Sequence, residues 1–376
     1  MANAALDKPL AVKKLTIRPD TQARTWPKIG MRPMILLILL GLTVGLFLLN
    51  VTTGSVDIPL GQVVKIIAGM DAEKRTWEII VMKFRLPKAI TASLAGAALA
   101  VAGLQMQTLF RNPLADPFVL GINSGASLGV ALVVLSAGSA GIGAALVNGL
   151  DLRGDIGLAV AASLGAGVVL ALVMAVARRV HSTMTLLILG LMFSYITGSL
   201  VSLLMYFAIT ERIQAFINWG FGSFSTVTWG QMQVFAPVVV IGLALALALA
   251  KQLNALLLGE VYARSMGMNV QRVRLGIIVS GAMLAGVVTA FCGPIAFIGV
   301  AVPHLTRAIL GTSDHRVTLP ANILMGASLA LIADFVAQMP GSQTVLPLNA
   351  VTALIGAPVV AWVILRQRNM RAAFGA

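Results

Sequence analysis

Long apolar stretches separated by short polar segments dominate the pattern of this chain. Ten stretches have about the 20 residues that a helix needs to cross the hydrocarbon core of a bilayer. We predict ten membrane-spanning helices, at residues 33–50, 88–110, 118–147, 156–177, 184–209, 233–250, 275–292, 294–311, 319–338 and 348–365. The alternating pattern of membrane-barrel strands is not seen, so the predicted fold class is an all-α polytopic membrane protein.

Composition supports this class. The chain has 376 residues, of which 58% are hydrophobic and 11% are charged, and its mean hydropathy is +0.94. A soluble protein typically carries about 25% charged residues, so this composition excludes a water-soluble domain of the same size. The single cysteine, Cys292, excludes an internal disulfide framework and a cysteine-based metal site. It lies in an apolar run and is interpreted as a packing residue.

The distribution of positive charge predicts the orientation in the membrane. With the amino terminus inside, 19 of the 27 Lys and Arg residues lie on the inner side and 8 on the outer side. The positive-inside rule therefore predicts that both termini are cytoplasmic. We expect a basic tail at 1–32, a transmembrane domain at 33–366 and a carboxyl-terminal tail at 367–376, with the first span kept as an anchor. This topology explains much of the net charge of +14, so binding to nucleic acid is not implied.

Six of the eight outer cations lie between the first two predicted spans. Lys65, Lys74 and Arg75 fit a solvated loop. Arg85 and Lys88 differ, because they flank Leu86-Pro87, where proline favours the start of a helix. Their spacing of three places both on one face of that helix, at the membrane edge. A fixed pair of cations suits the carboxylates of a docking protein.

Small residues predict a closely packed centre. The second predicted span is rich in alanine and contains Gly96 and Gly103. After the turns at Asn112-Pro113 and Asp116-Pro117, glycines recur with a spacing of four, at Gly121, Gly125 and Gly129. Small residues in register allow the backbones of membrane helices to approach closely.

Several stretches together resemble a known family. RLPKAITASLAGAALAVAG and LFRNPLADPFVLGINSGA are similar to the signature of the FecCD-type permeases, and HSTMTLLILG, LLLGEVYARSMGM and GPIAFIGVAVPHLTRAILGTSDHRVTLP agree with later parts of the same pattern. These permeases are the membrane subunits of ABC importers for iron–siderophore complexes, haem and vitamin B12. The resemblance runs from about residue 33 to 366 and implies a fold like that of the B12 importer permease.

The resemblance also implies roles for particular residues. Arg85 and Lys88 occupy the position that receives acidic residues of the binding protein. The cytoplasmic loop that meets the ATPase is matched by Gly259, Glu260, Ala263, Arg264 and Gly267, and the narrow cytoplasmic gate by Ser182 and Thr183. The chain departs from the family at Gln338, where a basic residue is expected, and at Val345-Leu346-Pro347-Leu348-Asn349, so the docking face is expected to differ.

Three ionisable groups raise alternatives. Asp334 lies inside a predicted span, where an acid is often functional, so a proton-coupled carrier with Asp334 as relay is the rival from another class. We favour a structural carboxylate that is hydrogen-bonded between helices. His304, Asp314 and His315 lack the spacing of metal ligands on a helix, so no metal site is expected.

We therefore expect a permease subunit that moves a ferric siderophore into the cytoplasm by alternating access, with haem or vitamin B12 as alternatives. The sequence has no GxxxxGK[ST] motif, so we expect no enzyme activity and no bound cofactor, with ATP and Mg on a separate subunit. The expected partners are a second permease subunit, identical or paralogous, two ABC ATPase subunits, a periplasmic or lipoprotein binding protein, and membrane lipid. The expected location is a bacterial plasma membrane.

Overall fold

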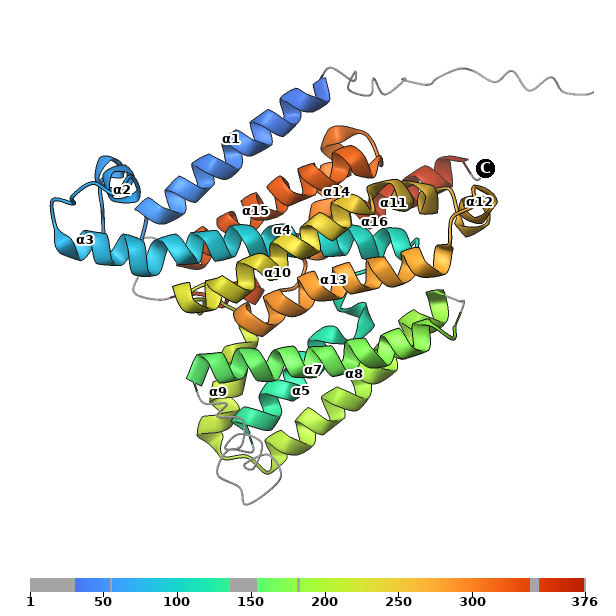
Figure 1. The fold of residues 1–376 in the computed structure, drawn as a ribbon, viewed down its shortest axis with the longest axis horizontal. Coiled ribbons are helices and arrows are strands. Elements are labelled where there is room, and N and C mark those ends of the chain that lie inside the picture. The colour runs from blue at the N-terminus through green and yellow to red at the C-terminus, as the bar shows by residue number, and fades with distance from the viewer. Residues whose placement is uncertain (1–30, 55, 136–153, 181–182, 339–344, 375–376) are drawn as a thin grey trace, which may run out of the picture.

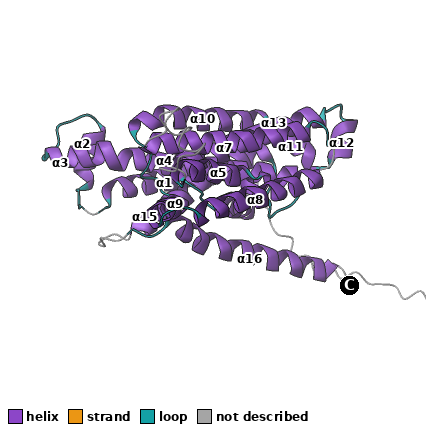
Figure 2. Ribbon diagram, turned by 90° about the horizontal axis from the view of Figure 1, so that it is seen from below, coloured by secondary structure: helices purple, strands orange, loops and turns teal. Residues whose placement is uncertain are grey.

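The structure is a computed structural model that describes residues 31–54, 56–135, 154–180, 183–338 and 345–374. Every regular element in these ranges is a helix, which confirms the all-α class (Figures 1 and 2). Seven described helices are long and apolar enough to cross a membrane: Pro33–Thr52, Arg75–Leu109, Ile156–Ala177, Met184–Tyr206, Trp229–Ala248, Val270–Cys292 and His315–Gln338. Three shorter apolar helices, Ile122–Val134, Ile298–Leu310 and Leu348–Trp362, correspond to the remaining predicted spans.

Helix α4 (Leu86–Leu109) forms the centre of the bundle. In Figure 1 it runs between α15 (His315–Gln338) on one side and α10 (Trp229–Ala248) and α13 (Val270–Cys292) on the other. Most of its residues are buried, including every residue from Ala95 to Leu109. The small residues of α4 explain this position, because they let the neighbouring helices approach its backbone.

A second group of helices packs beside α13. It contains α5 (Ile122–Val134), α7 (Gly154–Ala177), α8 (Thr183–Tyr206) and the short amphipathic α9 (Thr210–Gly220). Figure 1 shows this group along one edge of the molecule, and α1 (Met31–Thr52) along the opposite edge, against α15.

The two ends of the bundle carry different short helices. One, named the α2 end, carries α2 (Leu60–Ile67) and α3 (Arg75–Ile80), with α3 continuing through the π-helical turn η1 (Val81–Arg85) into α4. The other, named the α12 end, carries α11 (Ala250–Leu257) and α12 (Glu260–Ser265). Figure 1 places these sets at opposite extremes of the long axis.

The predicted eighth span, 294–311, needs a correction. Its helix, α14, covers only Ile298–Leu310, and 13 residues rise about 20 Å, less than the hydrocarbon core of about 30 Å. The preceding residues 293–297 are not helical, because Gly293 has a φ of 75° and Phe297 has a φ of 69°. Irregular backbone at membrane depth must be enclosed by protein. Here Asn349 of α16 (Leu348–Phe374) accepts a hydrogen bond from the Ala296 N–H at 3.1 Å.

The predicted third span, 118–147, also starts differently. A 3-10 turn, η2 (Pro117–Leu120), precedes α5, and the Asp116 side chain caps this turn by accepting the Phe118 N–H at 2.8 Å. Gly121, with a φ of 78°, then joins the turn to α5, which is described to Val134. The part of the prediction that covers 136–147 lies outside the described residues, as does the tail at 1–30.

Candidate functional site

Arg85 ties three segments together at the α2 end. Its side chain is 7% exposed and donates to the backbone oxygens of Val51 at 3.2 Å and Thr52 at 2.6 Å, at the end of α1, and to that of Val56. The last carbonyls of a helix lack partners within the helix, so a guanidinium is a suitable cap for them. Arg85 therefore fixes the end of α1 to the start of α4.

Lys88 forms an ion pair with Asp334 across the interface of α4 and α15. The distance from Nζ to Asp334 Oδ2 is 3.2 Å, and the two side chains are 12% and 8% exposed. Gln338 donates from Nε2 to the same carboxylate oxygen at 2.7 Å. The structure thus confirms the interhelical role predicted for Asp334 and supplies the basic partner that is not apparent from the local sequence. Gln338, at a position where the resemblance implied a basic residue, completes this cluster.

These contacts bear on the docking prediction. Arg85 and Lys88 are brought to one end of the molecule, as docking requires, but both head groups are turned to partners within the chain. They hold α4 against α1 and α15 rather than projecting from the surface. Docking through these two cations stays a prediction.

The segment from Gly259 to Gly267 has a well-defined frame at the α12 end. Gly259 and Gly267 have φ values of 110° and 80°, which side chains other than glycine rarely adopt, and they bracket α12. Ala263 is fully buried between them. The spacing of the motif therefore encodes a single short helix with a sharp turn on each side.

Glu260 attaches α12 to the transmembrane bundle. Its Oε1 accepts a hydrogen bond at 2.8 Å from the guanidinium of Arg274, a buried residue in the second turn of α13. Arg264 lies 3.6 Å from the other carboxylate oxygen and is largely exposed, so that pair contributes little. Sequence reasoning treated Arg274 only as one of the inner cations, because its contact with Glu260 depends on the turn at Gly267.

The outer surface of this segment is apolar. Val261 is 85% exposed, and Leu258, Tyr262 and Met266 are at least half exposed. We name these four exposed residues the α12 knob. An exposed apolar patch on a short helix that an ion pair holds to the bundle is typical of a contact with another protein. Sequence reasoning missed these residues, because their exposure depends on the turns on each side of α12.

A buried polar cluster joins α11 to α4 and α15 behind this knob. Asn254 Oδ1 accepts from the His315 backbone N–H at 2.8 Å, and Asn254 Nδ2 donates to Asp314 at 2.6 Å. His315 Nδ1 lies 2.8 Å from the same amide oxygen. Because an amide oxygen can only accept, Nδ1 is the donor in this contact. His315 Nε2 lies 2.9 Å from the Thr108 hydroxyl. The cluster links α11, the helix that precedes α12, to the end of α4.

Neighbouring groups at this end are also engaged. Arg307 donates to Gln107 at 2.8 Å, and His304 Nε2 lies 2.7 Å from the Pro113 carbonyl. Partial burial acts to raise the pKa of Asp314, but hydrogen bonds from the Arg316 N–H and Asn254 and the positive charge of Arg316 leave the pKa below its usual value. His304, Asp314 and His315 therefore hold the helix ends together.

Known proteins resemble this chain in sequence and in fold. The FecCD transport family matches residues 40–366. The chain belongs to the FecCD transport family. The vitamin B12 import system permease protein BtuC of Klebsiella pneumoniae is 36% identical over 292 residues, which cover 78% of this chain and 84% of that protein. The hemin transport system permease protein HmuU of Yersinia pestis is 36% identical over 291 residues, which cover 77% and 84%.

A solved structure shares the fold of this FecCD chain. It is described as an inward-facing conformation of a putative metal-chelate type ABC transporter, and it has 28% sequence identity and a TM-score of 0.76. The match covers 89% of this chain and 99% of that chain. Together with the family match, this likeness shows that the chain is a multi-pass membrane permease subunit of an ABC importer.

The five glycines singled out in the sequence of this FecCD chain lie at close helix contacts. A Cβ at Gly103 would lie 1.8 Å from the Gly299 carbonyl oxygen of α14, and one at Gly96 would lie 2.2 Å from that of Gly326 in α15. In α5, a Cβ at Gly125 or Gly129 would lie 2.6 or 2.1 Å from backbone oxygens of α7. Gly121, at the start of α5, faces the Gly190 oxygen of α8, 3.0 Å from its added Cβ.

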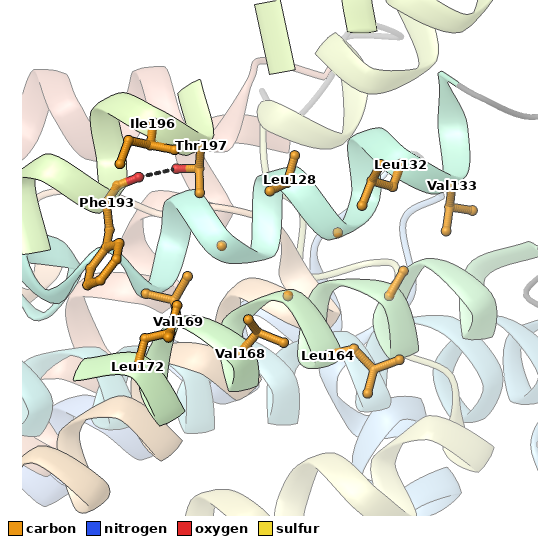
Figure 3. A pocket seen from close by; sticks show the side chains of 14 residues that line it. Leu128, Leu132, Val133, Leu164, Val168, Val169, Leu172, Phe193, Ile196 and Thr197 are labelled. Carbon is orange, nitrogen blue, oxygen red and sulfur yellow. Dashed lines mark hydrogen bonds between the residues drawn. The ribbon is translucent and has the colours of Figure 1, made fainter. Parts of the chain in front are cut away.

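Gly125 and Gly129 also line an apolar groove of about 440 Å³ between α5, α7 and α8, which Figure 3 shows from close by. Leu164, Val168 and Ile196 line its sides. The hydroxyl of Thr197 donates to the Phe193 carbonyl, so it offers no free donor to the groove (Figure 3). Nothing polar in this lining suits a chelated metal.

The predicted gate is described only in part. Thr183 begins α8, but nothing is described of its side chain, and Ser182 lies outside the described residues. The gate therefore stays a prediction.

Proposed function

We propose that this permease subunit imports a metal chelate, with a ferric siderophore as the first candidate and haem or vitamin B12 as alternatives. The observation that carries the proposal is the family match over residues 40–366. The names of the relatives support the substrate class, because haem and vitamin B12 both hold a metal in a large organic ring, and the structural relative is described as metal-chelate type.

Uptake by cells separates these substrates. Deletion of the gene for this chain is expected to abolish accumulation of radioactive iron supplied as a siderophore complex, and the wild-type chain is expected to restore it. Labelled vitamin B12 and haem are the matched controls. Selective loss of either of these, with iron–siderophore uptake unchanged, would contradict the siderophore assignment while leaving the import function intact.

We propose that the α12 end is cytoplasmic. Support comes from the excess of basic residues assigned to this side by the topology, and from exposed cations near it such as Arg178, Lys251 and Arg272. Cysteines placed at Arg272 and, at the other end, at Thr76 test the assignment. A membrane-impermeant thiol reagent should label position 76 in intact cells and position 272 only after permeabilisation, and the reverse result would refute it.

At this end, the α12 segment is proposed to contact a separate ABC ATPase. Gly259 and Gly267 set the turns, Ala263 seats the helix, and Glu260 fixes it to Arg274. Movement of the ATPase would then reach α13 through the ion pair and reach α4 through the Asn254–His315 cluster. The full assembly is proposed to contain two permease subunits, two ATPases and one binding protein.

The opposite end is proposed to receive the binding protein. Since Arg85 and Lys88 are engaged inside the chain, we propose that they shape this surface by holding α4 to α1 and α15. Arg85→Glu combined with Lys88→Glu is expected to weaken docking and import. Exposed Lys83→Glu is the control for charge alone, and a stronger loss from Lys83→Glu than from the pair would argue that surface charge decides docking.

Ser182 and Thr183 are proposed to form the narrow cytoplasmic gate at the start of α8. Replacing both with tryptophan should slow import without releasing the ATPase. Normal import by this double variant would refute the role. A proton-coupled carrier has no comparable support, because Asp334 is held by Lys88 and Gln338 and the family is that of ABC permeases.

A further inference from the structure

Helix α2 has apolar residues on two faces. Val63 and Ile66 are buried against the protein, while Leu60, Val64 and Ile67, at spacings of four and three, are 56%, 49% and 41% exposed. Met70, just after the helix, is 56% exposed. We name these four exposed residues the α2 stripe. Lys65 is the one charged residue within α2, so the exposed face has few groups that can form hydrogen bonds with water.

The helix lengths place α2 relative to the membrane. The continuous helix Arg75–Leu109 has 35 residues and rises about 52 Å, well beyond the hydrocarbon core of about 30 Å. Its contacts show which part projects. Arg85 meets the end of α1, and Lys88 meets Asp334 in the last turns of α15. Three membrane helices thus end at one level, and the 11 residues from Arg75 to Arg85 extend about 16 Å beyond it.

Helix α2 contacts α1 and η1, at the base of that projection. It therefore lies just outside the hydrocarbon boundary, at the depth of the lipid headgroups. Figure 1 draws α2 nearly end-on while α4 runs across the page, so α2 lies crosswise to the membrane helices. Its neighbour α1 is at the edge of the bundle and exposes Leu37 and Ile38 by more than 60%. The exposed apolar surface of α1 at this edge is suited to contact with lipid.

From these positions we infer that the α2 stripe is a membrane-interface contact, which rests on the bilayer at the α2 end with Leu60, Val64, Ile67 and Met70 at the boundary of headgroups and acyl chains. A helix of this kind buries its apolar face about 5–10 Å into that boundary. Lys65 has a long apolar stem that lets its ammonium reach the headgroups.

The contact has a structural consequence for the permease. Gln62 of α2 exchanges hydrogen bonds with Glu73, at 3.2 Å to the carboxylate and 3.3 Å from the backbone N–H, so α2 is fixed to the segment that leads into α3. The lipid surface would thereby set the height of the α3 projection above the membrane. This inference needs only a multi-pass membrane protein and is independent of the transported substrate.

Spin-label accessibility in phospholipid nanodiscs tests the inference on the full-length chain. Cys292→Ala supplies the background, and single cysteines replace Val64 and Ile67. Exposed Thr76 in α3 is the water control, and exposed Leu37 in α1 is the hydrocarbon control. Collision with oxygen should exceed collision with a water-soluble nickel chelate at 64 and 67, as at 37, and the order should reverse at 76.

Two outcomes would overturn the inference. Labels at 64 and 67 that meet the nickel chelate as freely as the label at 76 would show that the stripe faces water and is open to a protein partner. Spin–spin broadening between labels at position 64 of two chains would show that a second copy covers it. Two separate label positions keep the result interpretable if one substitution disturbs folding.

Discussion

Lys88 shows how a single side chain can be charged and yet largely withdrawn from water in this protein. Its ammonium lies 3.2 Å from Asp334, and Gln338 supplies a further hydrogen bond to the same carboxylate oxygen. Moving two charges out of water is costly, and their attraction offsets that cost only when the geometry is good and the remaining lone pairs are satisfied. The pair is therefore expected to matter most when one member is removed.

A double-mutant cycle measures this dependence. Lys88→Met and Asp334→Leu are each expected to lower the free energy of unfolding by about 3–5 kcal/mol, because each leaves an uncompensated charge. The double variant should lose much less than the sum of the two. Thermal unfolding in nanodiscs provides the measurement, with Lys65→Met, at an exposed position, as the control. Additive losses would show that the two residues act independently.

Asp116 provides a pH-dependent prediction at the same scale. Burial raises its pKa to about 6, against the lowering effect of the Phe118 N–H bond, whereas an unfolded aspartate has a pKa of about 3.9. Between these two pH values the folded chain binds more protons than the unfolded chain. The free energy of unfolding therefore falls as the pH rises from about 4 to about 6, and it is recovered as the pH falls through the same range.

Asp116→Asn keeps the acceptor oxygen and removes the charge. The variant is expected to be more stable than the wild type at pH 7.5, and the difference should shrink as the pH is lowered to 5. Midpoints of thermal unfolding at both values check this, with exposed Asp71→Asn as the control. A difference that does not change with pH would contradict the assignment.

At the scale of elements, the sequence was sufficient for the class and the order of the helices, because long apolar stretches have few alternatives in a membrane. The predicted helix bounds were wrong where the backbone conformation of single residues ends a helix. Gly293 and Phe297 adopt positive φ values that shorten α14, and the Asn349 bond that supports this break comes from a distant segment. The same limit applied to Arg85 and Lys88. Their position on a helix start was readable, but their burial depends on α1 and α15.

Two glycine-to-alanine substitutions are expected to change the stability of the protein in opposite directions. Gly103→Ala would place Cβ 1.8 Å from the Gly299 oxygen, so α4 and α14 must separate, and a loss of about 1–3 kcal/mol is expected. Gly167→Ala in α7 is the matched control, because no atom lies within 4 Å of the added Cβ. Alanine there should stabilise the helix by up to about 1 kcal/mol. Equal effects in thermal unfolding would exclude close packing as the cause.

For the whole molecule, the two ends of the bundle are connected through α4. Arg85 and Lys88 hold its beginning to α1 and α15, and Thr108 in its last turns meets His315 and, through it, Asn254 of α11. The α12 knob is attached to this frame by Glu260 and Arg274. A force applied to the knob would therefore reach helices that extend to the opposite end.

This arrangement predicts that attachment and contact at the α12 end can be separated. Val261→Asp with Tyr262→Ala should remove the apolar knob and abolish copurification of the ATPase, because these side chains are exposed and make few contacts within the chain. Glu260→Gln with Arg274→Met should leave the knob in place but loosen its base, so the ATPase is retained and ATP hydrolysis proceeds with less import per ATP. Copurification and the ratio of uptake to hydrolysis distinguish the two. Loss of the ATPase from both variants alike would mean that the ion pair shapes the contact itself.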